Sequence, residues 1–186
     1  MIGYAFCGSF CTISRSYAEM LRLISAGYEV LPIMSESVYT TDTRFGKAEE
    51  LRERVERVTG RKIIHTVVEA EPLGPKTPLE ALVIAPCTGN TLAKIASGIT
   101  DTAVTMAAKA HLRCDRPTLI SLASNDSLSQ NLSNIATLLL RKRVFFVPMK
   151  QDDPDAKPHS LVAEFSEIPE ALAAALKDRQ LRPLFT

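Results

Sequence analysis

The 186 residues are 46% apolar and 23% charged, and 22 Lys and Arg against 21 Asp and Glu leave a formal net charge of +1. This balance lacks the basic field of a nucleic-acid-binding protein, and the apolar runs are strand-sized, far below the roughly 20 residues of a membrane span. The first residues lack the basic head and apolar core of a signal peptide. We therefore expect a cytoplasmic protein without membrane or nucleic-acid partners, its four cysteines being free thiols in no zinc-binding pattern.

Apolar runs alternate with amphipathic segments along the chain, which is typical of βα units that feed a parallel sheet. The predicted strands cover residues 2–7, 29–34, 62–68, 81–85, 118–122 and 144–147. The predicted helices cover about 17–24, 47–59, 91–97, 102–112, 127–141 and 169–177, and Gly27 and Gly60 follow the first two.

Two polar segments interrupt this alternation and are expected to be loops. Residues 71–78 contain three prolines and a glycine, and residues 151–160 contain two prolines and three aspartates. We expect a single α/β domain over residues 1–186, with an open, doubly wound parallel sheet of five or six strands in a Rossmann-like or flavodoxin-like three-layer sandwich. An exposed loop at about 150–160 and a C-terminal helix complete it.

The loops that follow the strands are the candidate ligand sites, because ligands of such sheets bind beyond the carboxyl ends of the strands. The first, 8–12, offers a glycine and hydroxyls just before a helix, a combination that suits a phosphate. The dinucleotide pattern G-x-G-x-x-G is absent, so a mononucleotide is favoured over NAD. The alternative is that Ser9 or Thr12 is an ordinary helix cap.

Three further loops carry similar chemistry. Ser35-Glu36-Ser37 could reach the same phosphate or could be a plain turn. Residues 86–91, Pro-Cys-Thr-Gly-Asn-Thr, join a buried strand to a helix without a charged residue, which suits hydrogen bonding to a flat polar group; the alternative is a helix cap at Asn90 or Thr91. Ser124-Asn125-Asp126 repeats this hydroxyl and amide chemistry.

At these loops the chain resembles the FMN-dependent flavoprotein family, which includes peptidyl-cysteine and phosphopantothenoylcysteine decarboxylases. The resembling segments are Gly8-Ser9 and 86–101, where the usual Pro-Ala-Ser-Ala-Asn-Thr appears as Pro-Cys-Thr-Gly-Asn-Thr. The resemblance implies FMN, with its phosphate on Gly8, Ser9 and Ser35. The remaining expected contacts, to the ribityl chain or ring, are Phe10, Pro86, Thr88, Gly89, Asn90, Thr91, Ser124 and Asn125.

The resemblance also implies a function. The family's Pro-x-Met-Asn substrate motif is replaced by Ser124-Asn125-Asp126, and the chain is similar to the branch that works with a separate dehydrogenase-like subunit. That pair makes pyridine-2,6-dicarboxylate from a reduced lysine-pathway intermediate in the mother cell of spore formers. The implied protein is an FMN-linked oxidoreductase subunit and a homo-oligomer, a trimer or a multiple of it. The alternatives are an FMN-dependent cysteine decarboxylase and a non-catalytic nucleotide-binding assembly subunit.

Aromatising a dihydropyridine dicarboxylate requires a hydride acceptor and a base. The candidate catalytic residues are His65 and Cys87, each of which could instead be structural. His111 is expected to be a favourable charge at a helix C-terminus and His159 a surface residue. Four cations could pair with the substrate's carboxylates, and the sequence does not choose among them: Arg15, Lys94, Lys109 and Arg113.

Overall fold

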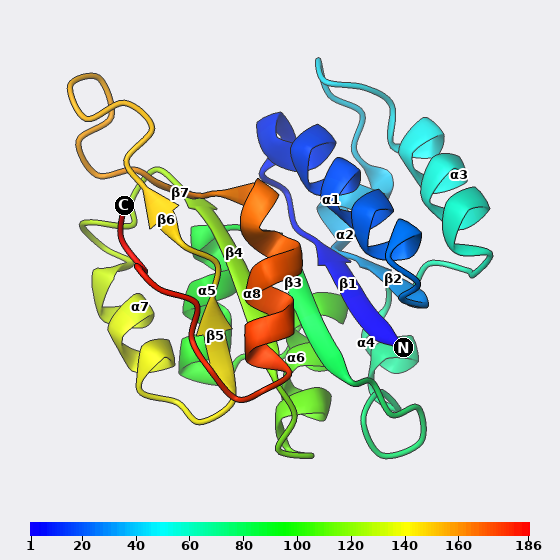
Figure 1. Ribbon diagram of the computed structural model, residues 1–186. Helices are drawn as coiled ribbons and strands as arrows, with labels where there is room; N and C mark the ends of the chain where they lie inside the picture. Colours follow the sequence, from blue (N-terminus) through cyan, green and yellow to red (C-terminus); the bar gives the residue numbers. More distant parts are fainter.

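A seven-stranded, mostly parallel sheet forms the centre of the protein in the computed structural model, which describes all residues 1–186 (Figure 1). Five strands run parallel: β1 (Ile2–Phe6), β2 (Val30–Met34), β3 (Ala81–Cys87), β4 (Thr118–Ser124) and β5 (Val144–Phe146). Two short strands, β6 (Met149–Lys150) and β7 (Leu161–Ala163), form an antiparallel hairpin whose β7 pairs with the carboxyl end of β4. The predicted α/β fold class is confirmed.

The parallel strands lie in the order β2-β1-β3-β4-β5. The chain moves outward from β1 to β2 and then crosses back to β3, so the direction of winding reverses between β1 and β3. In open parallel sheets, the loops on either side of such a reversal diverge and leave a crevice at the carboxyl ends of the strands. The topology therefore places the loops after β1 and β3 at the two sides of one crevice.

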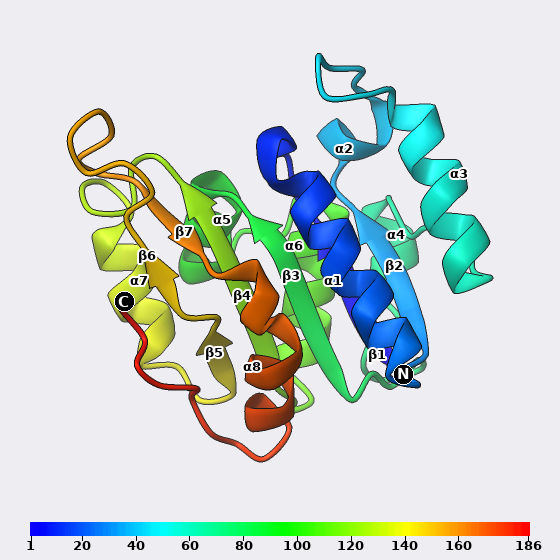
Figure 2. The same ribbon diagram turned by 45° about the horizontal axis from the view of Figure 1, so that its top comes forward.

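Helices cover both faces of the sheet (Figures 1 and 2). One face packs against α1 (Ile13–Ser25), α3 (Ala48–Thr59) and α8 (Ile168–Ala175). The other packs against α4 (Val67–Ala70), α5 (Gly89–Ser97), α6 (Ala103–Leu112) and α7 (Leu132–Leu139). Alternate side chains of β1 and the adjoining Cys7 divide between the two cores, Tyr4 and Phe6 on one side and Ala5 and Cys7 on the other, as the pleat requires. No helix is both long and apolar enough to cross a bilayer.

The predicted strand over 62–68 is wrong. Only Ile64 pairs with the sheet, in a single bridge to Ile33 at the outer edge of β2, and the chain then turns into α4. The cause is a capping box in which Thr66 Oγ1 accepts from the N–H of Glu69 and the Glu69 carboxylate accepts from the N–H of Thr66. This local hydrogen bonding outweighs the strand propensity of Val67 and Val68.

Other elements differ from the sequence-based expectation in smaller ways. The segment after β2, expected as a loop, forms the short helix α2 (Glu36–Thr40). Helix α7 begins at Leu132 instead of about 127, because residues 126–131 form turns in which the Asp126 carbonyl accepts from the N–H groups of Ser129 and Asn131. The β6–β7 hairpin was not expected, although the loop predicted at 151–160 lies at its tip.

Candidate functional site

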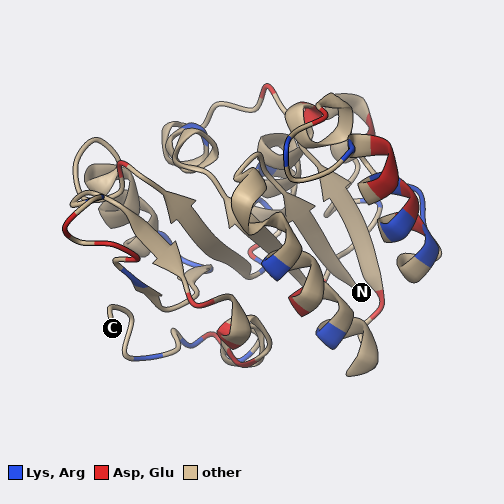
Figure 3. Cartoon of the chain, turned by 90° about the horizontal axis from the view of Figure 1, so that it is seen from above, with Lys and Arg blue, Asp and Glu red and all other residues tan.

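The carboxyl ends of β1, β3 and β4 border an open cleft of about 590 Å³. Its walls are residues of the loops after these strands, the first turn of α1 and the β6–β7 hairpin. A volume of this size lies within the roughly 300–1,000 Å³ of small-molecule sites. Seen from above, the charged residues are densest on α3, at the outer edge of the molecule (Figure 3).

The loop after β1 offers unused hydrogen-bond donors. The N–H of Gly8 has no acceptor within the chain, whereas the N–H groups of Ser9 and Thr12 donate to Cys7 O and Ser9 O. Neither Ser9 nor Thr12 caps a helix with its side chain, and Thr12 Oγ1 donates to Ser9 Oγ over 3.0 Å. Thr12 Oγ1 also lies 2.9 Å from Ser9 O. Ser9 and Thr12 occupy helix N-cap positions without a capping side-chain bond, so the Ser9 hydroxyl at the cleft is available to an anion.

The loop after β3 ends in an open helix N-terminus. Thr88 Oγ1 accepts from the N–H of Thr91 over 3.2 Å, so Thr88 is the cap of α5 and neither Asn90 nor Thr91 has that role. The N–H groups of Gly89 and Asn90, in the first turn, have no acceptor. Their donors and the exposed Asn90 side chain face the cleft.

A network of polar side chains after β4 packs closely against the loop after β3. Asp126 accepts from Ser124 Oγ and, over 2.8 Å, from Asn131 Nδ2. A Cβ on Gly89 would lie 2.4 Å from Ser124 Oγ and 2.7 Å from Asp126 Oδ1, so only glycine allows this approach. Asp126 was named in the sequence only as part of the candidate loop 124–126, without a role, and Asn131 was not among the predicted site residues.

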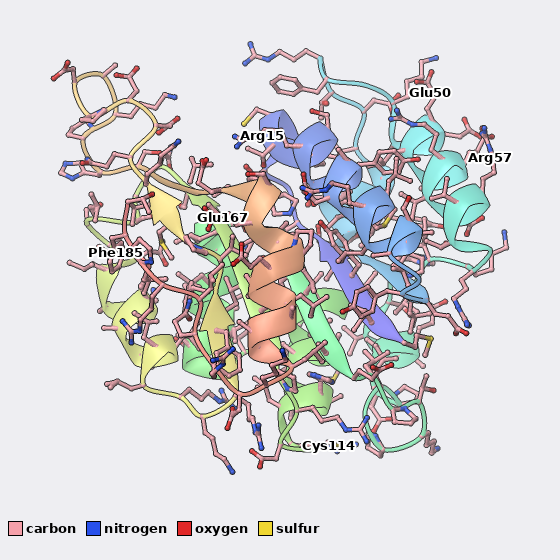
Figure 4. All side chains as sticks on the ribbon, in the orientation of Figure 1. Arg15, Glu50, Arg57, Cys114, Glu167 and Phe185 are labelled. Carbon is pink, nitrogen blue, oxygen red and sulfur yellow. The ribbon has the colours of Figure 1, made fainter.

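Two cations border the cleft. The guanidinium of Arg15, on the first turn of α1, lies 5.0 Å from the Phe165 ring centroid and 4.0 Å from a Glu164 oxygen (Figure 4). Lys157, at the hairpin tip, pairs with Asp152 over 2.8 Å. Of the four candidate cations, only Arg15 lines this cleft. The others lie elsewhere: Lys94 pairs with Asp101, Arg113 lies 4.0 Å from Glu71, and Lys109 lines a separate cavity beside α5.

The structure gathers seven predicted cofactor-binding residues at the cleft: Gly8, Ser9, Thr88, Gly89, Asn90, Ser124 and Asn125. The other four do not line it. Pro86 and Thr91 are buried behind the loop after β3, and Phe10 lines a different cavity. Ser35 is buried; its hydroxyl lies 3.1 Å from Ser37 Oγ, next to the position that a Gly8 Cβ would take.

The two predicted catalytic residues lie outside the cleft. Cys87 is fully buried, and burial, with the nearby Cys7, raises its pKa well above the usual value, so it remains a thiol. His65 stacks on Tyr39 with ring centroids 3.8 Å apart, and its Nδ1 lies 3.4 Å from a Glu69 oxygen. Within one chain neither side chain reaches the cleft, so the geometry does not support a catalytic role for either.

His111 is a neutral buried residue instead of the expected charge at a helix end. Its side chain is inaccessible to solvent, its Nε2 lies 2.9 Å from Pro117 O, and burial lowers its pKa below the usual 6.5. His159 is exposed at the hairpin tip. No group of three or more His, Cys, Asp or Glu side chains gathers to hold a metal ion.

The cleft fits a phosphorylated flat ligand. Free N–H groups at Gly8, Gly89 and Asn90 suit a phosphate and the polar edge of a ring system, and Gly89 leaves the backbone open to close approach. The fold is that of a flavodoxin-like α/β protein, with an open cleft at the reversal point of the sheet. A family model described as "Flavoprotein" matches residues 4–174, and the chain belongs to this flavoprotein family.

Two relatives are particularly similar. The chain is 42% identical over 183 residues to the B-subunit of dipicolinate synthase from Bacillus subtilis (strain 168), covering 98% of this chain and 92% of the relative. The crystal structure of the dipicolinate synthase B-subunit from Bacillus halodurans C superposes with a TM-score of 0.91 at 41% identity, covering 100% of this chain and 95% of that one.

More distant structures share the fold. The FMN-dependent cysteine decarboxylase SpaF superposes with a TM-score of 0.66 at 23% identity, over 94% of this chain and 95% of that one. DmrB from Burkholderia xenovorans, described as a cubic protein cage for redox transfer, superposes with a TM-score of 0.69 at 22% identity, over 95% of this chain and 94% of that one.

Proposed function

We propose that this chain is the FMN-binding subunit of a dipicolinate synthase, which oxidises a dihydropyridine dicarboxylate to pyridine-2,6-dicarboxylate together with a dehydrogenase-like subunit. The observation that carries the proposal is the convergence of neutral donor loops on one cleft at the reversal point between β1 and β3. The 42% identity to a dipicolinate synthase B-subunit over nearly the whole chain supports the choice of reaction.

The chain's own groups suggest how FMN would be held. The Gly8 N–H and the Ser9 hydroxyl would bind the phosphate. The Ser37 hydroxyl lies next to Gly8, and the predicted phosphate ligand Ser35 is buried against Ser37. The N–H groups of Gly89 and Asn90 would donate to the ribityl chain or the ring. When bound, the flavin supplies a two-electron acceptor for the hydride that leaves the substrate.

The charged residues at the cleft suit a dicarboxylate substrate. Arg15 on α1 and Lys157 on the hairpin both line the cleft, together with Asp126 and Asp152. Each cation can pair with one carboxylate of the substrate, Lys157 by exchanging its ion pair with Asp152. Loss of a hydride and a proton converts the dihydropyridine ring into a pyridine, and the proton needs an acceptor. Asp126 is a carboxylate held in the cleft by Ser124 and Asn131, and we assign the proton to it.

The proposal is tested with FMN and riboflavin, which differ only in the phosphate. We expect the purified protein to bind FMN at least about tenfold more tightly, because the donors after β1 meet a charged group only in FMN. Anaerobic addition of the dihydropyridine dicarboxylate, with and without the partner subunit, should then bleach the visible flavin band. Equal affinity for FMN and riboflavin would contradict a phosphate-binding site in the loop after β1.

Two further results would favour the other functions considered. Carbon dioxide release from a cysteinyl peptide would indicate a cysteine decarboxylase. Tight FMN binding without bleaching by the dicarboxylate, even with the partner present, would indicate an assembly subunit. We also propose a cytoplasmic location. We further propose a homo-oligomer, a trimer or a multiple of it, and mass measurement of the native protein tests this oligomeric state.

A further inference from the structure

A second cavity lies on the other side of α1, away from the flavin cleft. It encloses about 170 Å³ between α1, α2, α3 and the 41–47 loop. Three aromatic side chains, Phe10, Tyr17 and Phe45, stand in its wall, and Val38 and Leu51 form a buried apolar floor. None of its lining residues belongs to the flavin cleft.

The size of this cavity limits what it can hold. An engineered apolar cavity of about 150 Å³ in another protein binds benzene, so a volume of 170 Å³ accommodates one six-membered ring. A tricyclic ring system does not fit within that volume. Aromatic walls also favour a ring ligand, which can stack or meet them edge to face.

The charges at the cavity are all positive. Lys47 and Arg54 line it, no Asp or Glu does, and neither cation forms an ion pair. The Arg54 guanidinium lies 5.5 Å from the Tyr17 ring centroid, and its Nε donates to the Glu50 carbonyl, so its terminal nitrogens remain available. A ligand that combines a ring with an anionic group would be complementary to both features.

The mouth of the cavity carries an exposed aromatic side chain. Phe45 is 54% exposed on a tight turn in which Thr43 and Gly46 exchange backbone hydrogen bonds of 3.0 and 3.1 Å. The Arg44 guanidinium lies 4.8 Å from the Phe45 ring centroid, and a ring bound in the cavity would bury more of the Phe45 surface. The Phe45 side chain, one wall of the cavity, is therefore only partly buried.

We infer that this cavity binds a single-ring aromatic carboxylate, with the ring among Phe10, Tyr17 and Phe45 and the carboxylate on Lys47 and Arg54. The site is separate from the flavin cleft and does not depend on the proposed function. The product of the proposed reaction belongs to the same chemical class, so the site offers a place where such a product could act on the enzyme.

Calorimetric titration of the FMN-loaded full chain with benzoate and with benzyl alcohol tests the inference. We expect benzoate to bind and the neutral alcohol to bind at least about tenfold more weakly. Arg54→Gln should weaken benzoate binding about tenfold, whereas the matched control Arg57→Gln, on the outer side of the same helix, should leave it unchanged (Figure 4). Ala48→Leu, which fills the cavity, should abolish binding.

Three results would overturn the inference. Equal affinities of the Arg54 and Arg57 variants would show that the charge at the cavity plays no part. Equal affinities for benzoate and benzyl alcohol would show that the cavity binds apolar rings without recognising the carboxylate. Benzoate binding only to the FMN-free protein would show that the flavin ring and the probe compete for one site.

Discussion

At the scale of single residues, Gly89 decides how closely two loops of the flavin cleft approach. Adding a methyl group in Gly89→Ala would place a Cβ within 2.7 Å of Ser124, Asp126 and Asn131. We expect this variant to bind FMN at least about tenfold more weakly and to unfold at a lower temperature, since overpacking costs about 1–3 kcal/mol. Ser97→Ala, at the exposed end of α5, is the control. Unchanged FMN affinity in Gly89→Ala would show that this approach is not needed for binding.

Arg15 is the cation that the structure selects from the four suggested by the sequence. Arg15→Gln should raise KM for the dicarboxylate about tenfold or more, with little change in FMN affinity, because a charged hydrogen bond contributes about 1.5–3 kcal/mol. Lys109→Gln removes a charge beside another cavity and should leave KM unchanged. Steady-state kinetics with the partner subunit measure both, and similar KM values for the two variants would contradict the assignment.

His111 makes stability depend on pH. Its folded-state pKa is lowered by burial, so below the usual 6.5 the unfolded chain binds more protons than the folded one. Stability from this group is therefore complete above about pH 7 and falls as the pH drops through 6.5 towards the lowered value. Thermal melts from pH 8 to 5 should show a smaller loss for His111→Gln than for the wild type. Parallel curves would contradict the neutral buried state.

At the scale of elements, the sequence predicts well where one signal dominates. The buried apolar runs of β1, β3 and β4 and the amphipathic pattern of α3 are strong local signals, and these elements were found close to their expected bounds. The segment 62–68 carried two opposing signals, β-branched residues and a capping box, and the box prevailed. The strands β6 and β7 contain only two and three residues, so they owe their pairing to β4 and the chain around them.

The β6–β7 hairpin brings Lys157 to the cleft without belonging to the flavin loops. Its tip is held by local contacts, including the Asp152–Lys157 ion pair and the bond from Gln151 Nε2 to Pro158 O. Replacing residues 153–157 by Gly-Gly should leave the fold and FMN affinity nearly unchanged and should raise KM for the dicarboxylate at least about tenfold. Circular dichroism, FMN titration and kinetics test this. A loss of FMN binding would show that the tip holds the cofactor instead.

At the scale of the whole molecule, the site depends on topology that composition does not reveal. The hydroxyl and glycine loops could be identified along the sequence, and the strand order then brings seven of the expected residues together. Arg15, Lys157 and Asp126 could not be chosen in this way, because a charged side chain on a loop or helix end resembles any solvated residue until the fold supplies its neighbours. For the same reason Cys87 and His65 were predicted as catalytic residues, although the fold places both side chains outside the cleft.

A crystal structure of the protein with FMN tests the position of the flavin most directly. We expect the phosphate beside Gly8 and Ser9, the ring along the Thr88–Asn90 segment, and the cavity between α1 and α3 free of flavin. Electron density for the flavin ring in that second cavity, or a phosphate away from the loop after β1, would contradict it.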